Sequence, residues 1–334
     1  MNDAAAPARA AAPGAPAGVR DALARHARWR WWEVAVFAGL AASWFVLGER
    51  VLLAREIAIL ALFAVSLDLV LGYAGIVSLG HAAFFGAGAY AAALFAKHVM
   101  PDPLIGLAFA TALSALLGLL TSPLILRGSD LTRLMVTLGV ASVLYELANR
   151  LDPWTGGADG LQGVVMGPLL GRFEFDLPGR VAYAYAIVVL LVALFACRRV
   201  VKSPFGVSLQ ALRDNRLRAS SIGLAVNARL VAVYTLAGGL AGAAGALLAQ
   251  TTGFASLDVL DFHRSADVLL MLVIGGTGYL YGGLFGAVAF KLLQDVLAAW
   301  TPQYWMFWLG LFLVALVLVG RERLLKPWTW RRGP

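Results

Sequence analysis

The sequence predicts an all-α fold, a polytopic bundle of transmembrane helices, and three observations point to it. Of the 334 residues, 60% are hydrophobic and only 14% are charged, whereas a soluble domain is roughly 45–50% apolar and about 25% charged. Stretches such as 103–126, 230–257 and 296–320 carry no charged residue, and each is long enough for a helix to cross the hydrocarbon core. The short alternating segments of a β-barrel are absent from the sequence. A soluble enzyme is therefore excluded.

Basic residues flank the apolar stretches and set the expected topology. The net charge of +8 comes largely from clusters in 20–30, 198–229 and 321–332, and cytoplasmic loops carry such an excess of Lys and Arg. We expect no nucleic-acid partner, because no basic and aromatic module stands outside the apolar stretches. Cys197 is the only cysteine, so an internal disulfide is excluded and no metal site is expected.

Placing the basic clusters inside the cell gives about ten spans, with both chain ends cytoplasmic. The candidate spans are 32–48, 51–71, 79–96, 104–126, 131–149, 181–197, 230–251, 266–282, 284–300 and 303–320. The weakest prediction is 266–300, where Lys291 and Asp295 could pair on one helix face or lie at the membrane interface, which would leave eight or nine spans. Ten spans divide into two five-span halves of opposite orientation, as in an inverted repeat.

This topology divides the chain into a cytoplasmic tail over 1–31, a transmembrane domain over 32–320 and a cytoplasmic tail over 321–334. The first tail is expected to be disordered, because its Ala, Pro and Gly residues show no periodicity. Basic residues before the first apolar run could also mark a signal peptide. Charged residues such as Glu49 and Arg50 follow that run in place of a small-residue cleavage site, so we expect a retained span.

Two hydrophilic loops are long enough to carry function. The loop 150–180 is expected outside the cell and the loop 198–229 inside it. Apolar residues at helical spacing predict one short amphipathic helix over Ser208–Ser221 in the inner loop, and Gly223 is placed to end it. The alternatives are a helix lying on the lipid surface for the inner segment and an inert surface loop for the outer one.

Glycines interrupt two of the expected membrane segments. The first set lies in 72–90, beside Ser78 and His81, and the second follows the span that starts at 266. Glycine permits close helix packing or broken-helix geometry around a cavity, and one broken segment near the start of each half is typical of an inverted-repeat transporter. Packing is the simpler interpretation of any single glycine. The residues concerned are Gly72, Gly75, Gly80, Gly86, Gly88, Gly275, Gly276, Gly278 and Gly282.

No motif in the sequence indicates catalysis or nucleotide binding. The phosphate-loop pattern GxxxxGK[ST] is absent, and the acidic residues Glu56, Asp68, Glu146 and Asp295 are scattered, with no His or Ser grouping around them. We therefore expect no catalytic residue, no cofactor bound by this chain and no enzymatic activity. Any energy for transport must come from elsewhere.

Four motifs resemble one family. GYAGIVSLGHAAFFGAGAYAAA from Gly72, TGGADGL from Thr155, SPFGVSLQALRDNRLRASSIGL from Ser203 and LLMLVIGGTGYLYGGLFGA from Leu269 are similar to the permease subunits of branched-chain amino-acid ABC importers, and most similar to the LivM type. They follow the family's order over about 50–320.

The departures from the family pattern are few. This chain has Asp68 where an amide is common and Ala158 where the outer loop usually has Ser. It also has Gly283 where Pro often follows a tryptophan–glycine pair, which is here Tyr281 and Gly282. They leave the substrate open, because related permeases carry urea, short amides or other small solutes.

The resemblance implies a permease in a bacterial inner membrane that works with other chains. These are a second, related permease subunit, two cytoplasmic ABC ATPases that consume the ATP, and a periplasmic solute-binding protein, with the lipid bilayer around them. Transport would proceed by alternating access, as closure of the ATPases pulls on the coupling helices.

The resemblance and the residue pattern together nominate three groups of site residues. The expected translocation path is Asp68, Ser78, His81, Phe84 and Phe85. The expected ATPase-coupling residues are Leu209, Leu212, Arg213, Asp214, Arg216, Leu217 and Gly223, with the leucines pointing into the ATPase. The expected binding-protein loop contains Thr155, Gly156, Gly157, Asp159 and Gly160. A lone buried His such as His81 is also common as a hydrogen-bonding partner between helices.

Two other classes remain open at this point. An ion-coupled secondary transporter or channel would need an intramembrane carboxylate, for which Asp68 or Asp295 could serve. An integral-membrane enzyme is disfavoured, because the sequence offers no catalytic grouping.

Overall fold

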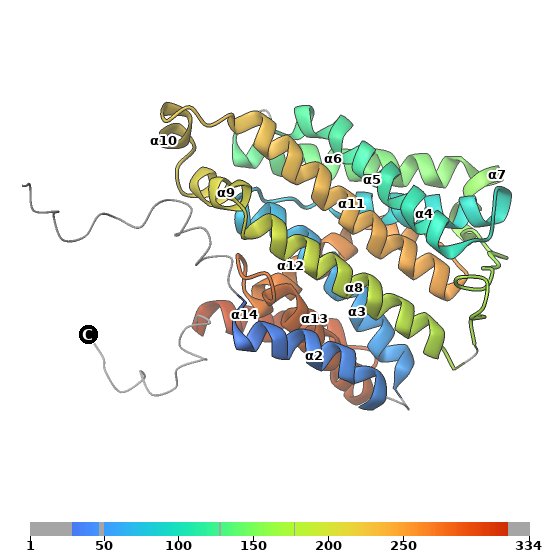
Figure 1. The fold of residues 1–334 in the computed structure, drawn as a ribbon. Helices are drawn as coiled ribbons and strands as arrows, with labels where there is room; N and C mark the ends of the chain where they lie inside the picture. The colour runs from blue at the N-terminus through green and yellow to red at the C-terminus, as the bar shows by residue number, and fades with distance from the viewer. Residues whose placement is uncertain (1–28, 47–49, 127, 177, 320–334) are drawn as a thin grey trace, which may run out of the picture.

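The computed structural model describes residues 29–46, 50–126, 128–176 and 178–319 (Figure 1). Within these ranges the regular elements are helices, apart from two isolated β-bridges, so the predicted all-α class is confirmed. The expected tails fall almost entirely outside them. The ten long helices of the described residues are α2 (Trp31–Val46), α3 (Val51–Asp68), α4 (Ala82–His98), α5 (Pro103–Ile125), α6 (Asp130–Arg150), α8 (Arg180–Val201), α11 (Val226–Thr252), α12 (Phe262–Gly275), α13 (Gly282–Trp300) and α14 (Trp305–Val319).

Shorter elements join the long helices. They are the π-helix η1 (Leu69–Tyr73), α7 (Asp152–Thr155), η2 (Gly157–Asp159), α9 (Pro204–Asp214), α10 (Arg216–Ser221) and η3 (Leu257–Leu260).

Six of the described helical segments are long and apolar enough to cross a bilayer, so the chain is a multi-pass membrane protein. They are Val51–Tyr73, Pro103–Ile125, Asp130–Arg150, Arg180–Val201, Val226–Thr252 and Gly282–Trp300. The shortest remaining long helix, α12, has 14 residues, or about 21 Å at 1.5 Å per residue, against a hydrocarbon core of about 30 Å. The predicted end of span 266–282 is wrong, because α12 ends at Gly275 and a loop connects it to α13, which begins at Gly282. Segment 266–300 forms two helices.

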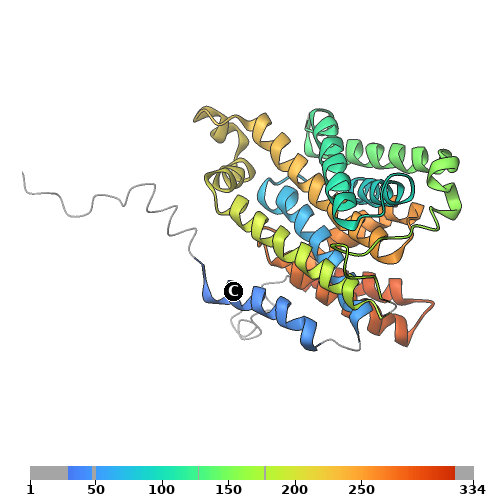
Figure 2. The same cartoon turned by 45° about the vertical axis from the view of Figure 1, so that its right-hand side comes forward.

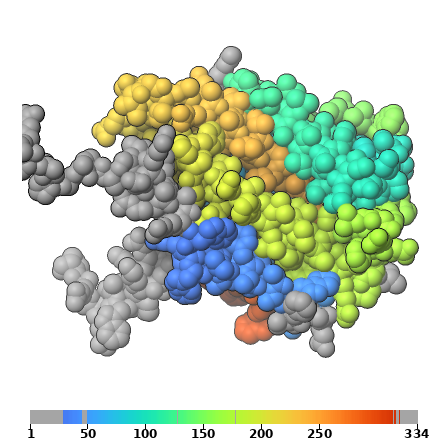
Figure 3. All heavy atoms as spheres, in the orientation of Figure 1, coloured from blue at the N-terminus to red at the C-terminus, as the bar shows by residue number. Residues whose placement is uncertain are grey.

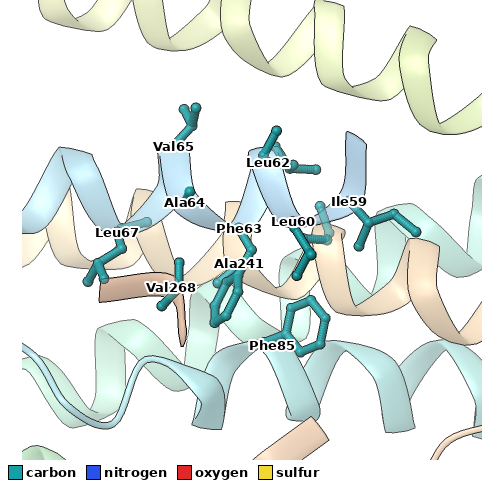
Figure 4. Packing of buried hydrophobic residues seen from close by; sticks show 14 of the residues in the cluster. Ile59, Leu60, Leu62, Phe63, Ala64, Val65, Leu67, Phe85, Ala241 and Val268 are labelled. Atoms are coloured by element: carbon teal, nitrogen blue, oxygen red, sulfur yellow. The ribbon is translucent and has the colours of Figure 1, made fainter. Parts of the chain in front are cut away.

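The central helix is α3, which other helices surround. From Ala58 to Val70 every residue is buried, which is the pattern of a helix that is apolar all round and lies inside a bundle. Phe63 and Phe85 of α4 have ring centroids 4.5 Å apart, and Figure 4 shows Leu60, Phe63 and Leu67 directed toward α4 and its neighbours. In the space-filling view of Figure 3, α8 covers the middle of one face, beside α2.

Helix α11 packs closely against α4 and α5 through small residues. A Cβ atom on Gly88 would lie 2.1 Å from the carbonyl oxygen of Gly242, and one on Gly245 would lie 1.8 Å from that of Phe85. Ser114 of α5 donates its hydroxyl to the carbonyl of Phe84 at 3.3 Å. Without side chains in between, the backbones approach closely, which is how helices gain van der Waals contact inside a bilayer.

The two hydrophilic loops lie at opposite ends of the bundle. Helices α9 and α10 are at one end and α7 is at the other, in Figure 1 and in the turned view of Figure 2. The prediction of one helix over Ser208–Ser221 is wrong, because the chain breaks at Asn215. Its backbone is extended (φ −160°), and its side chain accepts the N–H of Arg218 as the cap of α10.

A buried ion-pair cluster fastens α2 to α8. The carboxylate of Glu33 accepts from Arg198 Nη2 at 2.8 Å and lies 3.0 Å from Lys202 Nζ. The guanidinium of Arg198 also lies 3.8 Å from the ring centre of Trp29, a cation–π distance. No sequence pattern indicated this cluster, since Glu33 and Arg198 are 165 positions apart.

Two features support the predicted repeat, and a third corrects it. The helices α4 and α12 are each third in a series of five long helices. Their starts lie side by side, since the N–H of Ala82 donates to Ser265 Oγ at 2.9 Å. The glycine-rich segments do not correspond, however. The first separates the second and third helices of its half, and the second separates the third and fourth.

We predict that Gly245→Ala lowers the melting temperature of the detergent-solubilised chain, because the new methyl group would collide with the backbone at Phe85. Overpacking of this kind costs about 1–3 kcal/mol. The matched control is Gly39→Ala in α2, where a Cβ meets nothing within 4 Å and helix propensity improves by about 1 kcal/mol. Thermal unfolding followed by tryptophan fluorescence checks this, and equal melting temperatures for the two variants would contradict it.

Candidate functional site

The two glycine-rich segments meet inside the bundle, although 210 positions separate their contacting residues. The fully buried carboxylate of Asp68 accepts the N–H of Gly278 through Oδ1 at 2.8 Å. The hydroxyl of Tyr73 accepts the N–H of Leu280 at 3.1 Å. A Cβ on Gly72 would lie 2.3 Å from the nitrogen of Gly278. We call this contact between 68–75 and 275–282 the glycine junction.

Local backbone geometry explains why glycine is needed here. After Asp68 the helix widens into the π-helix η1, a form that is rare and occurs mostly as single turns at functional sites. Gly75 (φ +67°) and Gly278 (φ +79°) then adopt left-handed conformations, which glycine tolerates without steric cost. The chain can therefore turn sharply in both segments at the point where they touch.

Arg213 of α9 reaches the same junction from the end of the molecule. Its Nη1 donates to the carbonyl of Gly72. A Cβ on Gly75 would lie 2.7 Å from Arg213 Cγ, and one on Gly278 would lie 2.9 Å from Nη1. The inner loop is thus in direct contact with both glycine-rich segments. Asp68 Oδ2, on the other side, has no hydrogen-bond partner within the described part of the chain.

The residues predicted for the path lie in the core of this chain. Asp68, Ser78, His81, Phe84 and Phe85 are all buried, and none of them lines the three pockets described below. The structure brings His81 and Phe84 together in ring contact, edge to face, and stacks His81 on Phe63.

His81 has the surroundings of a residue that connects helices. Its Nε2 lies 2.9 Å from Ser66 Oγ on α3, and the ring is fully buried. The alternative interpretation of a lone buried His, a hydrogen-bonding partner between helices, therefore describes its contacts in this chain.

The remaining glycines of both sets serve close backbone contact. A Cβ on Gly80 would lie 2.0 Å from the carbonyl oxygen of Thr137, and one on Gly86 would lie 2.3 Å from Leu260 Cδ2. Gly275 and Gly282 bring α12 and α13 together, with 1.8 Å between a Cβ on Gly275 and the carbonyl oxygen of Gly282. Gly276, at φ +95°, is the C-cap of α12. Packing is thus their observed role in this structure.

The predicted coupling residues divide into a buried and an exposed group. Leu209 and Leu212 are fully buried in this chain, so the expectation that they point into another protein is wrong. Leu217 is 81% exposed and Ile222 is 73% exposed. The break at Asn215 causes this difference, because it turns α10 away from the face that α9 buries.

The polar members of the coupling group lie near the surface. The side chain of Asp214 is 73% exposed, and Arg216 is half-buried. Gly223, at φ +84°, follows the end of α10, and a Cβ there would meet nothing within 4 Å.

The loop that is predicted to contact the binding protein forms a tight, hydrogen-bonded turn. Thr155 is buried, and its hydroxyl donates to the carbonyl of Ala148 and accepts the N–H of Gly157. Gly156 and Gly160 have positive φ and pack against each other, since a Cβ on Gly156 would lie 2.2 Å from the carbonyl oxygen of Gly160. Asp159 is exposed at the tip of this turn.

The described surface includes three pockets of about 270–430 Å³. One of about 270 Å³ is almost wholly apolar and lies among α2, α3, α8 and α13. A second of about 330 Å³ lies beside the glycine junction, where Glu33 and Lys202 join Gly278 in its wall. A third, of about 430 Å³, is lined by Leu138, Ala141, Ser142, Tyr145, Glu146, Leu260, Asp261 and Phe262. Sequence reasoning missed it, although Ser142, Tyr145 and Glu146 are polar residues within a predicted span.

Comparison with known proteins gives consistent relatives. The family described as the permease component of the branched-chain amino acid transport system matches residues 50–318. The chain is 29% identical over 318 residues to the high-affinity branched-chain amino acid transport system permease protein LivM of Escherichia coli, covering 87% of this chain and 73% of that protein. LivM of Salmonella typhimurium is 29% identical over 297 residues, with coverages of 80% and 68%.

A more distant relative has a different named role. The autoinducer 2 import system permease protein LsrC of an Enterobacter species is 30% identical over 232 residues, or 66% of this chain and 64% of that protein. No solved structure matches the chain. The chain therefore belongs to the family of permease components of branched-chain amino acid transport systems and is the membrane permease subunit of an ABC importer.

Proposed function

We propose that this permease carries branched-chain amino acids across the inner membrane of a bacterium. The observation that supports this substrate is the similarity to LivM, which extends over 87% of the chain, whereas the similarity to the autoinducer 2 permease extends over 66%. The family also supports ATPase and binding-protein partners in general. Our proposal adds a second, related permease subunit, two ATPase subunits and a cytoplasmic position for both chain ends.

We predict ATP-dependent uptake of leucine by the assembled importer in proteoliposomes. The complex would be purified through a tag on this chain, together with the subunits that co-purify, and supplied with its binding protein and radiolabelled leucine. Leucine uptake that requires ATP, and that exceeds the uptake of urea and of acetamide, would support the proposal.

Two results would contradict that prediction. Preferential uptake of urea or acetamide would show that one of these solutes, and not leucine, is the substrate. Transport by this chain alone, driven by an ion gradient without ATP, would favour the secondary-transporter class.

The inner loop is the proposed contact with the ATPase. Two exposed apolar residues, Leu217 of α10 and Ile222 directly after it, would enter a groove of that subunit, while the buried Leu209 and Leu212 hold α9 against the permease. Burial of two exposed aliphatic side chains stabilises a contact by roughly 1.5–3 kcal/mol each. The split loop thus offers one helix for docking and one for transmission.

We predict that the double variant Leu217→Glu and Ile222→Glu loses the ATPase on affinity purification, because two charges would replace the apolar contact. The matched control, Leu217→Met with Ile222→Leu, keeps apolar side chains at both positions and should retain the ATPase. Immunoblotting of the purified fractions measures the ratio of the subunits. Retention of the ATPase by the glutamate variant, at the level of the control, would overturn the docking assignment.

Arg213 is the proposed link between the ATPase and the glycine junction. A displacement of α9 would act on the carbonyl of Gly72, to which Arg213 donates, and from there on Gly278, which Asp68 holds. A hydrogen bond to a charged group contributes about 1.5–3 kcal/mol. This is within the range of coupling free energies between two sites, about 1–3 kcal/mol.

We predict that Arg213→Ala lowers the leucine transported per ATP hydrolysed by roughly tenfold, the effect of about 1.4 kcal/mol of lost coupling, while the ATPase remains bound. Arg199→Ala removes an exposed arginine at the end of α8 and should leave this ratio unchanged. Parallel measurements of uptake and phosphate release test the prediction. An unchanged ratio in Arg213→Ala would show that Arg213 transmits nothing.

A further inference from the structure

Helix α2 is fastened to α8 at both of its ends. Near the inner loop, the carboxylate of Glu33 accepts from Arg198 at 2.8 Å. At the other end of α2, the hydroxyl groups of Ser43 and Tyr183 lie 2.6 Å apart, and the ring of Trp44 stacks on that of Tyr183 with 6.0 Å between the centroids. Glu33 and Ser43 are separated by about 15 Å along the helix, so the position of α2 between the two attachments is fixed.

The pocket of about 270 Å³ lies between these attachments and separates α2 from the central helix α3. On α8 and on α13, residues at a spacing of three or four line it, so they share one face of each helix. These residues are Tyr183, Ile187 and Leu190 on α8, and Leu284, Val288 and Leu292 on α13. The pocket is therefore elongated and follows the helix axes for roughly 10–12 Å.

The pocket lies within one half of the bilayer. Its lining on the spanning helix α8 extends from the first turn, at Tyr183, to the middle of the helix, at Leu190. Half of the hydrocarbon core is about 15 Å thick, which is close to the length of the pocket. Arg50 lines the pocket at its outer end and directly precedes the spanning segment that starts at Val51, so its guanidinium belongs at the level of the lipid headgroups.

The lining combines one charge with a long aliphatic wall. Among the described residues that line the pocket, Ser43, Arg50 and Tyr183 are polar and the others are Leu, Ile, Val or Ala. The hydroxyl groups of Ser43 and Tyr183 bond to each other, which leaves Arg50 as the group that can recognise a charged ligand. A guanidinium matches the geometry of a phosphate group.

We infer that this pocket binds one acyl chain of an anionic phospholipid, with the lipid phosphate against Arg50. Because α2 is held at both ends, the walls cannot close on each other, and an empty space would deprive them of van der Waals contact. Water does not suit the pocket, since a buried water needs two to four polar partners. An extended hydrocarbon chain from the surrounding leaflet meets both the shape and the chemistry of the walls.

Small side chains on α3 keep the pocket open. Ala54 and Ala58 both line it, and they are 7% and 3% exposed. A larger apolar side chain at either position would occupy the space of the acyl chain. The inference uses neither the proposed substrate nor any other subunit, so it can be tested on this chain alone.

The first test is a titration of the delipidated chain with dioleoyl phosphatidylglycerol, followed by native mass spectrometry in a mild detergent. Ala54→Phe should weaken binding of the first lipid by roughly tenfold or more, because the ring fills the pocket. The matched control is Ala112→Phe, which adds the same ring on the exposed face of α5 and should bind like the parent. Parental affinity in a monodisperse Ala54→Phe sample would overturn the inference.

The second test concerns the headgroup and leaves the walls of the pocket intact. The parent should bind phosphatidylglycerol more tightly than phosphatidylcholine with the same chains, and Arg50→Gln should bind the two lipids equally. Arg172→Gln removes an exposed arginine of the outer loop and should keep the parental preference. An undiminished preference in Arg50→Gln would overturn the phosphate contact. Binding of oleate without binding of phosphatidylglycerol would overturn the phospholipid as ligand.

Photocrosslinking locates the chain without any substitution, so it decides the question even if Ala54→Phe fails to fold. Phosphatidylglycerol with a diazirine in its acyl chain should label Ile187 and Leu190, which are buried within this chain. An excess of ordinary phosphatidylglycerol should suppress these labels, as identified by peptide mapping. Labelling confined to exposed residues, such as Leu116 of α5, would show that lipid contacts only the outer surface and would overturn the inference.

Discussion

Asp68 joins the two glycine-rich segments through its side-chain carboxyl group, and the other contacts of the glycine junction depend on this bond. It accepts the N–H of Gly278 and so fixes the end of the central helix α3 against the loop between α12 and α13. A buried polar group is costly unless it is hydrogen-bonded; here Oδ1 of Asp68 is bonded to the backbone amide of Gly278, and Arg213 donates to the carbonyl of Gly72 in the same junction. The glycines at this junction are required because side chains would fill the space in which the two segments touch.

The junction puts the inner loop in direct contact with both glycine-rich segments. Arg213 spans the distance from the surface helix α9 to the carbonyl of Gly72, so no chain of intervening side chains is needed. In the proposed cycle, force from the ATPase would enter at α10 and reach both glycine-rich segments through one residue. The close backbone contacts of α4 with α11, as at Gly88 and Gly242, would then carry the displacement as a rigid unit.

The buried cluster around His81 fastens the central helix to the start of α4. His81, Ser66 and Phe63 lie in the core, where a passing solute would have to displace packed side chains.

The sequence by itself determined the class of fold, the approximate position of ten helices and the family, because apolar length and four local motifs are properties of consecutive residues. It also nominated the glycines, Asp68 and Arg213 as site residues. Only the tertiary structure decided what these residues do. The contact of Asp68 with Gly278 joins positions 210 apart, and the ion pair of Glu33 with Arg198 joins positions 165 apart. The side of α6 that remains uncovered likewise depends on how the other helices pack. Composition and local spacing do not indicate such long-range contacts, because burial and exposure depend on which helices pack together.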